Sequence, residues 1–280
     1  MSATDARPPD ASQGGWRPPA GTADPRFSTP QRLALNGRPA LAYHHEAGDG
    51  PAVVFLGGFA STMDGTKATH LHAHARAAGW RFVRFDYRGH GASDGRFVDA
   101  TIGAWRDDAL AVLDHVVAAP CLLVGSSMGA WIATLSAIAR PDRVAGVVTV
   151  AAAPDFVDLL LRPALSAAQR KDLATQGWTP RPSRYGDGPY PIGRAMVEQG
   201  SDHRVLTGAP IPVACPLRAL HGLADPDVPF GLSLRLVDAW GAGDADAVLI
   251  KDGDHRLSRP SDLNRLTACV GAMRAGLATG

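Results

Sequence analysis

The chain has 280 residues, a length that suits one large domain whose core needs no disulfide or metal for stability. Its 28 basic and 27 acidic side chains give a net charge of +1, so composition offers no reason to expect nucleic acid or an anionic membrane as a partner. No apolar run reaches the roughly 18 residues of a membrane span. The three cysteines are scattered and odd in number, which is typical of reduced thiols in the cytoplasm.

The first 27 residues contain five prolines and no apolar signal segment, so they predict a disordered tail rather than a secretory leader. A β-hairpin is expected next, because two alternating apolar stretches meet at Asn36-Gly37, a pair that tolerates the positive φ angles of a type I′ turn. Residues 51–58 then form a continuous apolar run that ends in glycines, as a buried parallel strand does. The folded domain is therefore expected at residues 28–280.

From there to the C-terminus, short apolar runs alternate with segments of helical periodicity. Further strands are expected near residues 81–87, 120–125, 144–153, 216–222 and 246–253. Helices are expected near residues 102–116, 128–140, 229–240 and 261–276. This alternation predicts an α/β fold with a mostly parallel, eight-stranded sheet and helices on both faces, made mixed by the leading hairpin.

One segment interrupts the alternation and is far longer than the dozen or so residues that a crossover needs. Residues 156–177 predict one or two helices, and residues 178–193 predict an irregular arm rich in proline and glycine. We interpret about 157–208 as a small helical lid insertion; a surface excursion without function is the alternative. Leu159, Leu160 and Leu161 cannot all face one way in a helix, so at least one, with Leu159 and Leu160 as candidates, is expected to face a substrate.

The pattern G-x-S-x-G, which can mark a serine nucleophile, occurs twice. Around Ser127, the strand-like run CLLV leads in and the helical run MGAWIATLSAIA leads out, as the strained strand-to-helix turn of a nucleophile elbow requires. Ser93 follows a polar loop and precedes another loop, so we interpret it as a chance match. The same loop lacks the third glycine of a dinucleotide motif, because Asp94 stands there, and no cofactor is expected.

A serine hydroxyl needs a base within hydrogen-bond reach and an acid that orients the base. His255 follows a late strand and a glycine turn, at the edge where loops build sites in open α/β sheets. Asp225 follows the preceding strand and is favoured as the acid over Asp227, which suits the N-cap of the next helix. His221, at the end of the same strand, is expected only to shape its loop.

Two backbone N–H groups are needed to stabilise a tetrahedral oxyanion. One is expected from Met128, directly after the predicted nucleophile, and the other from Phe59, after the paired glycines at 57 and 58. Arg256, directly after the predicted base, could hold a substrate carboxylate or could pair with Asp254 at the surface.

Three histidines lie at alternate positions in a predicted helix near residue 70. Of His70, His72 and His74, only the first and third share a helix face, so the cluster predicts a solvated helix face rather than a metal site. Ser61 and Asp64 precede this helix with the spacing of a capping pair. No metal site is expected anywhere in the chain.

Six segments, FLGGFASTMDGTKA, RFVRFDYRGHGASDGRF, LVGSSMGAWI, PSRYGDGPYPI, CPLRALHGLADPDVP and IKDGDHRLS, together carry a resemblance that spans about residues 33–275. The chain resembles the α/β-hydrolase branch of a mitochondrial enzyme described as mycophenolic acid acyl-glucuronide esterase and palmitoyl-protein thioesterase. The resemblance implies an α/β-hydrolase fold and hydrolysis of esters and thioesters by Ser127, Asp225 and His255. The N-terminal tail departs from this branch, since it does not look like a mitochondrial leader.

These observations predict a cofactor-free serine hydrolase that cleaves carboxylic esters or thioesters through an acyl-enzyme on Ser127. A C–C bond hydrolase or a perhydrolase could use the same three residues. A non-catalytic receptor with this fold is the alternative from another class. The sequence leaves the acyl length, the preference between esters and thioesters, and the oligomeric state open.

Overall fold

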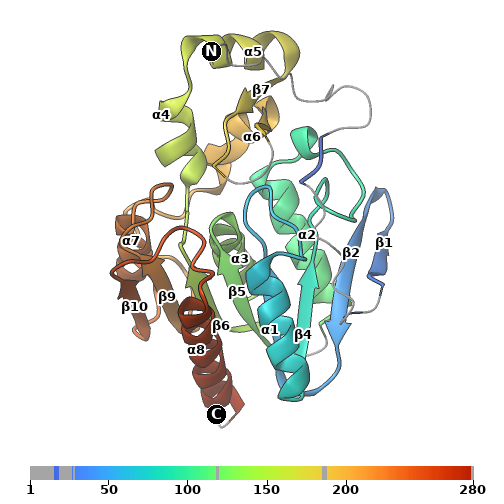
Figure 1. Cartoon of the computed structure of the whole chain (residues 1–280), viewed down its shortest axis with the longest axis vertical. Helices are drawn as coiled ribbons and strands as arrows, with labels where there is room; N and C mark the ends of the chain where they lie inside the picture. The colour runs from blue at the N-terminus through green and yellow to red at the C-terminus, as the bar shows by residue number, and fades with distance from the viewer. Residues whose placement is uncertain (1–15, 19–26, 28, 118–119, 185–187, 279–280) are drawn as a thin grey trace.

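The computed structural model of the chain describes residues 16–18, 27, 29–117, 120–184 and 188–278 (Figure 1). Its centre is an eight-stranded sheet with the order β1-β2-β4-β3-β5-β6-β9-β10. The strands are β1 (Gln31–Leu35), β2 (Arg38–Glu46), β3 (Asp49–Leu56), β4 (Trp80–Phe85), β5 (Cys121–Ser126), β6 (Val144–Val150), β9 (Leu217–Gly222) and β10 (Ala245–Ile250). The predicted α/β-hydrolase architecture and strand number are confirmed.

The sheet is mixed in the way the leading hairpin predicts. Strand β2 pairs antiparallel with both β1 and β4, whereas the six strands from β4 to β10 pair in parallel. The hairpin turns at Asn36-Gly37, where Gly37 has a φ of 69°. Strands β5 and β6 are the most deeply buried, and they carry the continuous apolar runs expected for strands covered on both faces.

Helices cover both faces of the sheet (Figure 1). One face packs against α1 and α8, whose apolar residues join one core cluster with the sheet. The other face packs against α2, α3 and α7 around a larger cluster that contains the buried rings of Trp105 and Trp131. The helices are α1 (Thr66–Ala77), α2 (Ile102–His115), α3 (Met128–Ala139), α7 (Gly231–Ala239) and α8 (Pro260–Ala278).

The segment between β6 and β9 lies above the carboxyl ends of the parallel strands (Figure 1). It contains the π-helix Val157–Leu161, α4 (Arg162–Ala164), α5 (Ala167–Gln176), β7 (Trp178–Arg181), β8 (Tyr190–Gly193), α6 (Arg194–Gln199) and the 3₁₀-helix Gly200–His203. The prediction of an irregular arm at 178–193 is wrong at both ends, because β7 and β8 pair antiparallel there. The insertion is therefore helical with a small two-stranded sheet.

The predicted disordered tail is described in part. Of residues 1–27, only 16–18 and 27 lie among the described residues, and these contact the domain. Trp16 packs edge-on against Phe97 at 5.0 Å, and Phe27 stacks on His72 at 4.0 Å. The rest of residues 1–27 lies outside the described residues, so the disordered tail stays a prediction.

Two expectations around α1 are also wrong. The helix is capped by Gly65 without a side-chain bond, and Asp64 instead forms a 2.5 Å ion pair with the buried Arg84. His72 is buried rather than solvated, since its ring accepts a hydrogen bond from Arg84 and contacts Glu46 at 3.2 Å. Helical spacing alone could not reveal that a buried arginine lies beneath this face.

Candidate active site

Ser127 lies at the turn between β5 and α3, in the geometry of a nucleophile elbow. Its φ of 55° and ψ of −116° are unfavourable for a residue with a side chain, and such strain is typical of functional turns. The flanking glycines make the turn possible. A Cβ on Gly129 would lie 2.1 Å from the Leu56 carbonyl oxygen, and one on Gly125 would lie 2.4 Å from that of Gly129. Only glycine allows helix and sheet to approach this closely.

Ser93, in the other copy of the motif, has a structural environment. Its side chain is completely buried. The hydroxyl donates to the Asp86 carbonyl at 2.6 Å and accepts from the Ala42 backbone N–H at 2.8 Å. A hydroxyl engaged in this way cannot reach a substrate, which agrees with the interpretation of Ser93 as a chance match.

The loop predicted to supply an oxyanion donor packs against the elbow. A Cβ on Gly58 would lie 3.4 Å from the Cβ of Ser127 and 3.2 Å from the Ser126 carbonyl oxygen. Phe59 follows directly, so its backbone lies beside the predicted nucleophile. Met128 is the first residue of α3, and N–H groups in the first turn of a helix have no partner within the helix.

The structure brings together the predicted acid and base from two different loops. His255 donates from Nδ1 to Oδ2 of Asp225 at 2.8 Å. Asp225 has a side chain that is 1% exposed, whereas that of His255 is 17% exposed and can be reached from solvent. The acid loop is tied to the base loop by a backbone hydrogen bond of 3.0 Å from Ala224 to the Gly253 carbonyl.

Asp225 is held as a carboxylate by four donors. Burial alone would raise its pKa, but hydrogen bonds from His221 and His255 outweigh burial and hold the pKa well below its usual range. Its Oδ1 also accepts the backbone N–H groups of Asp227 at 2.8 Å and Val228 at 2.9 Å. The expectation that Asp227 is the N-cap of α7 is wrong, because Phe230 occupies that position.

Asp225, Asp227 and His255 are also the one group among the described residues whose ligand atoms lie close enough for a metal ion, within 4.8 Å of one another. The oxygens of Asp225 already accept hydrogen bonds from two backbone N–H groups and two imidazoles. Hydrogen bonding thus explains why these groups lie close together, and a cation would have to displace these donors.

Arg256 lies next to the predicted base with an exposed side chain. Its carbonyl accepts a hydrogen bond from Lys67 of α1 at 2.5 Å, which fixes the base loop to the helix. Asp254, the surface partner considered for Arg256, accepts the backbone N–H of Leu257 at 2.9 Å through Oδ1.

The three consecutive leucines of the insertion face different ways, as the helical period requires. Leu161 is buried, and Leu159 is 37% exposed. Leu160 is partly buried and packs against a small cluster that contains Ala153 and Val228. Because Val228 donates its N–H to Asp225, Leu160 lies near the acid loop, and Leu159 does not share that environment.

Aromatic rings join the insertion to the predicted oxyanion loop, which sequence reasoning missed. The ring of Phe59 lies 5.9 Å from Phe156 and 5.4 Å from Tyr190 of β8, both in edge-to-face contact. Two rings of the domain, Phe97 and Trp105, also contact Phe59, with ring centroids at 5.0 and 5.7 Å. Periodicity within single segments carries no signal for such a contact.

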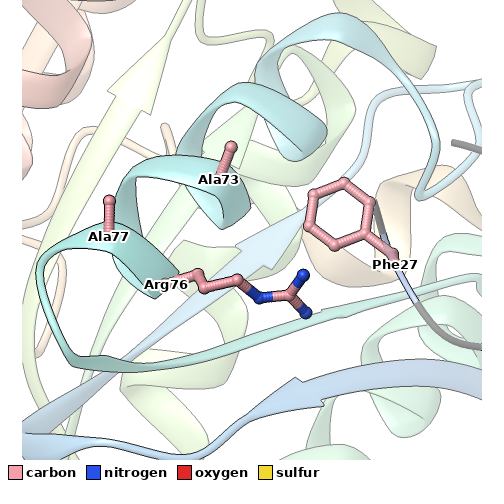
Figure 2. Close-up of a pocket in the computed structure, with 4 residues that line it drawn as sticks. All are labelled: Phe27, Ala73, Arg76 and Ala77. Carbon is pink, nitrogen blue, oxygen red and sulfur yellow. The ribbon is translucent and has the colours of Figure 1, made fainter. Parts of the chain in front are cut away.

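A groove of about 490 Å³ lies away from these residues, on the outer face of α1 (Figure 2). It is lined by Phe27, Ala73, Arg76 and Ala77, and the guanidinium of Arg76 lies 5.1 Å from the Phe27 ring. Helix α1 runs antiparallel to the strands, so Ala77 lies at the opposite edge of the sheet from Ser127. We therefore do not assign the groove to the candidate active site around Ser127.

The strained serine turn, the acid–base pair and the parallel sheet define the class of α/β hydrolases, and comparisons with known proteins agree. A family model described as "Serine aminopeptidase, S33" matches residues 50–181. The chain is 38% identical over 233 residues to "Palmitoyl-protein thioesterase ABHD10, mitochondrial" of Mus musculus, covering 83% of this chain and 78% of the relative. The relative of the same name from Homo sapiens is 36% identical over 233 residues, covering 83% of this chain and 76% of the relative.

Solved structures give the same result. The structure of mouse alpha/beta hydrolase domain-containing protein 10 has a TM-score of 0.81 and 36% identity, covering 89% of this chain and all of that chain. A hydrolase from Agrobacterium vitis S4 has a TM-score of 0.82 and 40% identity, covering 89% of this chain and 99% of that chain. The chain belongs to the α/β-hydrolase family of these relatives, and it is an enzyme that hydrolyses ester or thioester bonds.

Proposed function

We propose that the protein cleaves carboxylic esters or thioesters through an acyl-enzyme on Ser127, with His255 as base and Asp225 as acid. The observation that carries this proposal is the 2.8 Å hydrogen bond between His255 and Asp225, at the sheet edge where Ser127 occupies its strained turn. The hydrogen bond leaves Nε2 of His255 as the ring nitrogen that accepts the serine proton.

In the first half of the reaction, the Ser127 oxygen attacks the substrate carbonyl carbon while His255 takes the hydroxyl proton. The backbone N–H groups of Met128 and Phe59 donate to the oxyanion, and the alcohol or thiol leaves with the proton from His255. Water then repeats the sequence on the acyl-enzyme, with His255 as base, and releases the carboxylic acid and free Ser127.

The insertion supports an apolar acyl group as the part of the substrate that the enzyme recognises. Leu160, Phe156 and Val228 bring apolar surface to the acid loop, and Phe59 brings an aromatic ring to the oxyanion loop. The curated relatives are named palmitoyl-protein thioesterases, and a long acyl thioester is the corresponding candidate here. Leu159 and Arg256 remain candidates for contacts with the outer part of a substrate.

Turnover of p-nitrophenyl esters and S-acyl thioesters of graded chain length tests the proposal. We expect Ser127-dependent hydrolysis that rises from acetyl toward medium-chain substrates. Hydrolysis that persists undiminished in Ser127→Ala would overturn the mechanism. Binding of a ligand without turnover and without fluorophosphonate labelling would favour a receptor instead, and cleavage of carbon–carbon bonds in preference to esters would favour the rival hydrolase chemistry.

A cytoplasmic location belongs to the same proposal. Its support is that Cys121, Cys215 and Cys269 are all free thiols, and burial raises the pKa of each of these groups to about 11 or 12. The names of the curated relatives carry the word mitochondrial, so fractionation of cells that express the tagged protein decides between the two. No helix among the described residues is long and apolar enough to cross a membrane.

A further inference from the structure

His221 lies at the end of β9, completely buried, and every polar atom of its ring is engaged. Its Nε2 lies 3.2 Å from Oδ2 of Asp225 and 3.0 Å from the Val228 carbonyl oxygen. Its Nδ1 lies 2.6 Å from the hydroxyl of Ser233 in α7. The ring therefore connects α7 to the same carboxylate oxygen that accepts from His255.

The partners determine the tautomer of His221. Both groups near Nε2, a carboxylate oxygen and a carbonyl oxygen, can only accept, so Nε2 carries the proton and donates to them. Nδ1 then accepts the hydroxyl proton of Ser233. The other tautomer would direct a nitrogen lone pair at Asp225 and Val228 at about 3 Å, which is repulsive.

We infer that His221 is a positioning residue for catalysis: its Nε2–H holds Asp225 in the rotamer that orients His255 and withdraws negative charge from the shared Oδ2. The inference rests on the proposed function, since it acts through the acid and the base of that mechanism. A carboxylate that has lost this donor would attract the proton on the base more strongly. The base would then lose its proton at a higher pH, and the carboxylate would be free to rotate.

Other charged groups near the pair are common to every variant proposed below. Asp227 contacts Asp225 through its backbone and lies 3.7 Å from Arg184, while Asp254 and Arg256 flank His255 in the base loop. From α1, Lys67 approaches the carbonyl of Arg256, and burial, followed by repulsion from Arg256, lowers the pKa of Lys67 to about 8. A difference in kcat or in pH profile between the variants therefore arises from the hydrogen bonds of His221 and not from these groups.

Three substitutions distinguish a role of His221 in positioning Asp225 from a contribution of His221 to the stability of the fold alone. His221→Leu removes the donor, His221→Gln restores an N–H close to the position of Nε2, and Ser233→Ala frees Nδ1 and with it the choice of tautomer. For each variant, kcat and KM for a short p-nitrophenyl ester are measured from pH 5 to 9. Active sites are counted by fluorophosphonate titration, so that unfolded protein does not enter kcat.

For His221→Leu we expect kcat to fall about 10-fold with KM unchanged, the effect of losing one hydrogen bond to a charged group. The acid limb of kcat/KM should move to higher pH by roughly half a unit. His221→Gln should recover most of kcat and the original limb, and Ser233→Ala should lose about threefold in kcat with a limb moved in the same direction as in His221→Leu.

Unchanged kcat and an unchanged acid limb in His221→Leu would overturn the inference, as would a loss of kcat that His221→Gln fails to recover. If His221→Leu does not fold, an unshifted limb in Ser233→Ala would overturn it equally. The proposed function fails by a different result, namely turnover in Ser127→Ala, so the two failures are distinguishable.

Discussion

At the scale of single residues, the backbone of Ser127 carries strain that the fold must offset elsewhere. Its positive φ exposes the hydroxyl at the start of α3, and the glycines at 125 and 129 allow sheet and helix to meet closely around it. Removing the hydroxyl leaves the strain and the oxyanion donors intact. We expect Ser127→Ala to fold and to lose at least about 10³-fold in turnover, because donors and binding alone give only residual catalysis.

Ser93→Ala is the matched control, and the structure refines what it should do. The hydroxyl of Ser93 links Ala42 to Asp86 in the interior, so its loss leaves two buried groups without a partner. We expect the free energy of unfolding to fall by about 1–3 kcal/mol, while turnover per active site changes little. Chemical denaturation and active-site titration measure the two effects separately, and a loss of turnover comparable to that of Ser127→Ala would reverse the assignment of the two serines.

The dependence of kcat/KM on pH follows from the base that must accept the serine proton. Asp225 has a pKa well below its usual range, so it stays ionised throughout the accessible range and contributes no limb above pH 5. We expect one rise in kcat/KM with increasing pH, as the histidine base loses its proton, and no second limb from Asp225. A flat profile from pH 5 to 9, with chemistry as the limiting step, would count against His255.

The sequence predicted which of these residues would meet, because each follows a strand of a parallel sheet and such strands end at one edge. Asp225 and His255 indeed come together from two loops. The contact of His221 with the same carboxylate could not be predicted in this way. It depends on the loop at residues 223–230 folding back over the end of β9. The hydrogen bonds from the backbone N–H groups of Asp227 and Val228 to Asp225 hold the loop in that shape.

At the scale of elements, the insertion offers a comparison between neighbouring leucines. Leu160 packs against the cluster that contains Val228, whereas Leu159 is 37% exposed. If the insertion forms the roof of the acyl site, Leu160→Ala should lower the preference for medium-chain over acetyl esters several-fold, since each buried CH₂ contributes up to about 0.8 kcal/mol. Leu159→Ala is the control. Equal chain-length profiles in the two variants would show that Leu160 does not contact the acyl chain.

The insertion also contacts the oxyanion loop, which changes what its removal should do. Because Phe59 packs against Tyr190 of the insertion, replacing 157–208 by a linker should flatten the chain-length preference and also lower kcat for acetyl esters. Tyr190→Ala should lower kcat for acetyl esters about threefold, through the loss of one aromatic contact of about 0.5–1.5 kcal/mol, and Tyr190→Phe should not. A lidless variant with unchanged kcat and profile would exclude both roles.

The elements that the sequence did not predict are short or depend on distant contacts. Strands β7 and β8 have four residues each and include Pro180 and Pro191, so they are too short for an alternation to be recognised. The π-helix at Val157–Leu161 follows Asp155, whose carboxylate accepts the backbone N–H groups of Val205 and Leu206 from the far end of the insertion. These hydrogen bonds join residues about fifty positions apart, so no pattern within a short stretch of the sequence indicates them.

At the scale of the whole molecule, buried histidines predict sensitivity to acid. Burial lowers the pKa of His44, His72 and His90 from 6.5 to about 4. Between these values the unfolded chain binds protons that the folded protein excludes, so the free energy of unfolding falls as pH falls. Burial raises the pKa of Asp86 to about 6 and also raises the pKa values of Asp108 and Asp155, which opposes this trend. Burial lowers the pKa of His203 as well, which adds to the trend.

We therefore expect the melting temperature at pH 5 to lie roughly 5 °C or more below that at pH 7. His90 provides a variant for this prediction, since its ring lies among Phe97 and Trp105 and its Nε2 has no hydrogen-bond partner among the described residues. His90→Phe should reduce the difference between the two melting temperatures. A melting temperature that is equal at both values of pH would contradict the assignment of these histidines as neutral in the fold.

The proposed reaction proceeds through a covalent acyl-enzyme on Ser127. Mass spectrometry of the protein quenched during turnover of a slowly hydrolysed acyl ester, followed by peptide mapping, tests it directly. We expect one acyl group per chain, located on the peptide that contains Ser127. It should be present in Ser93→Ala and absent from Ser127→Ala. An acyl group on any other residue, or full turnover in Ser127→Ala, would contradict it.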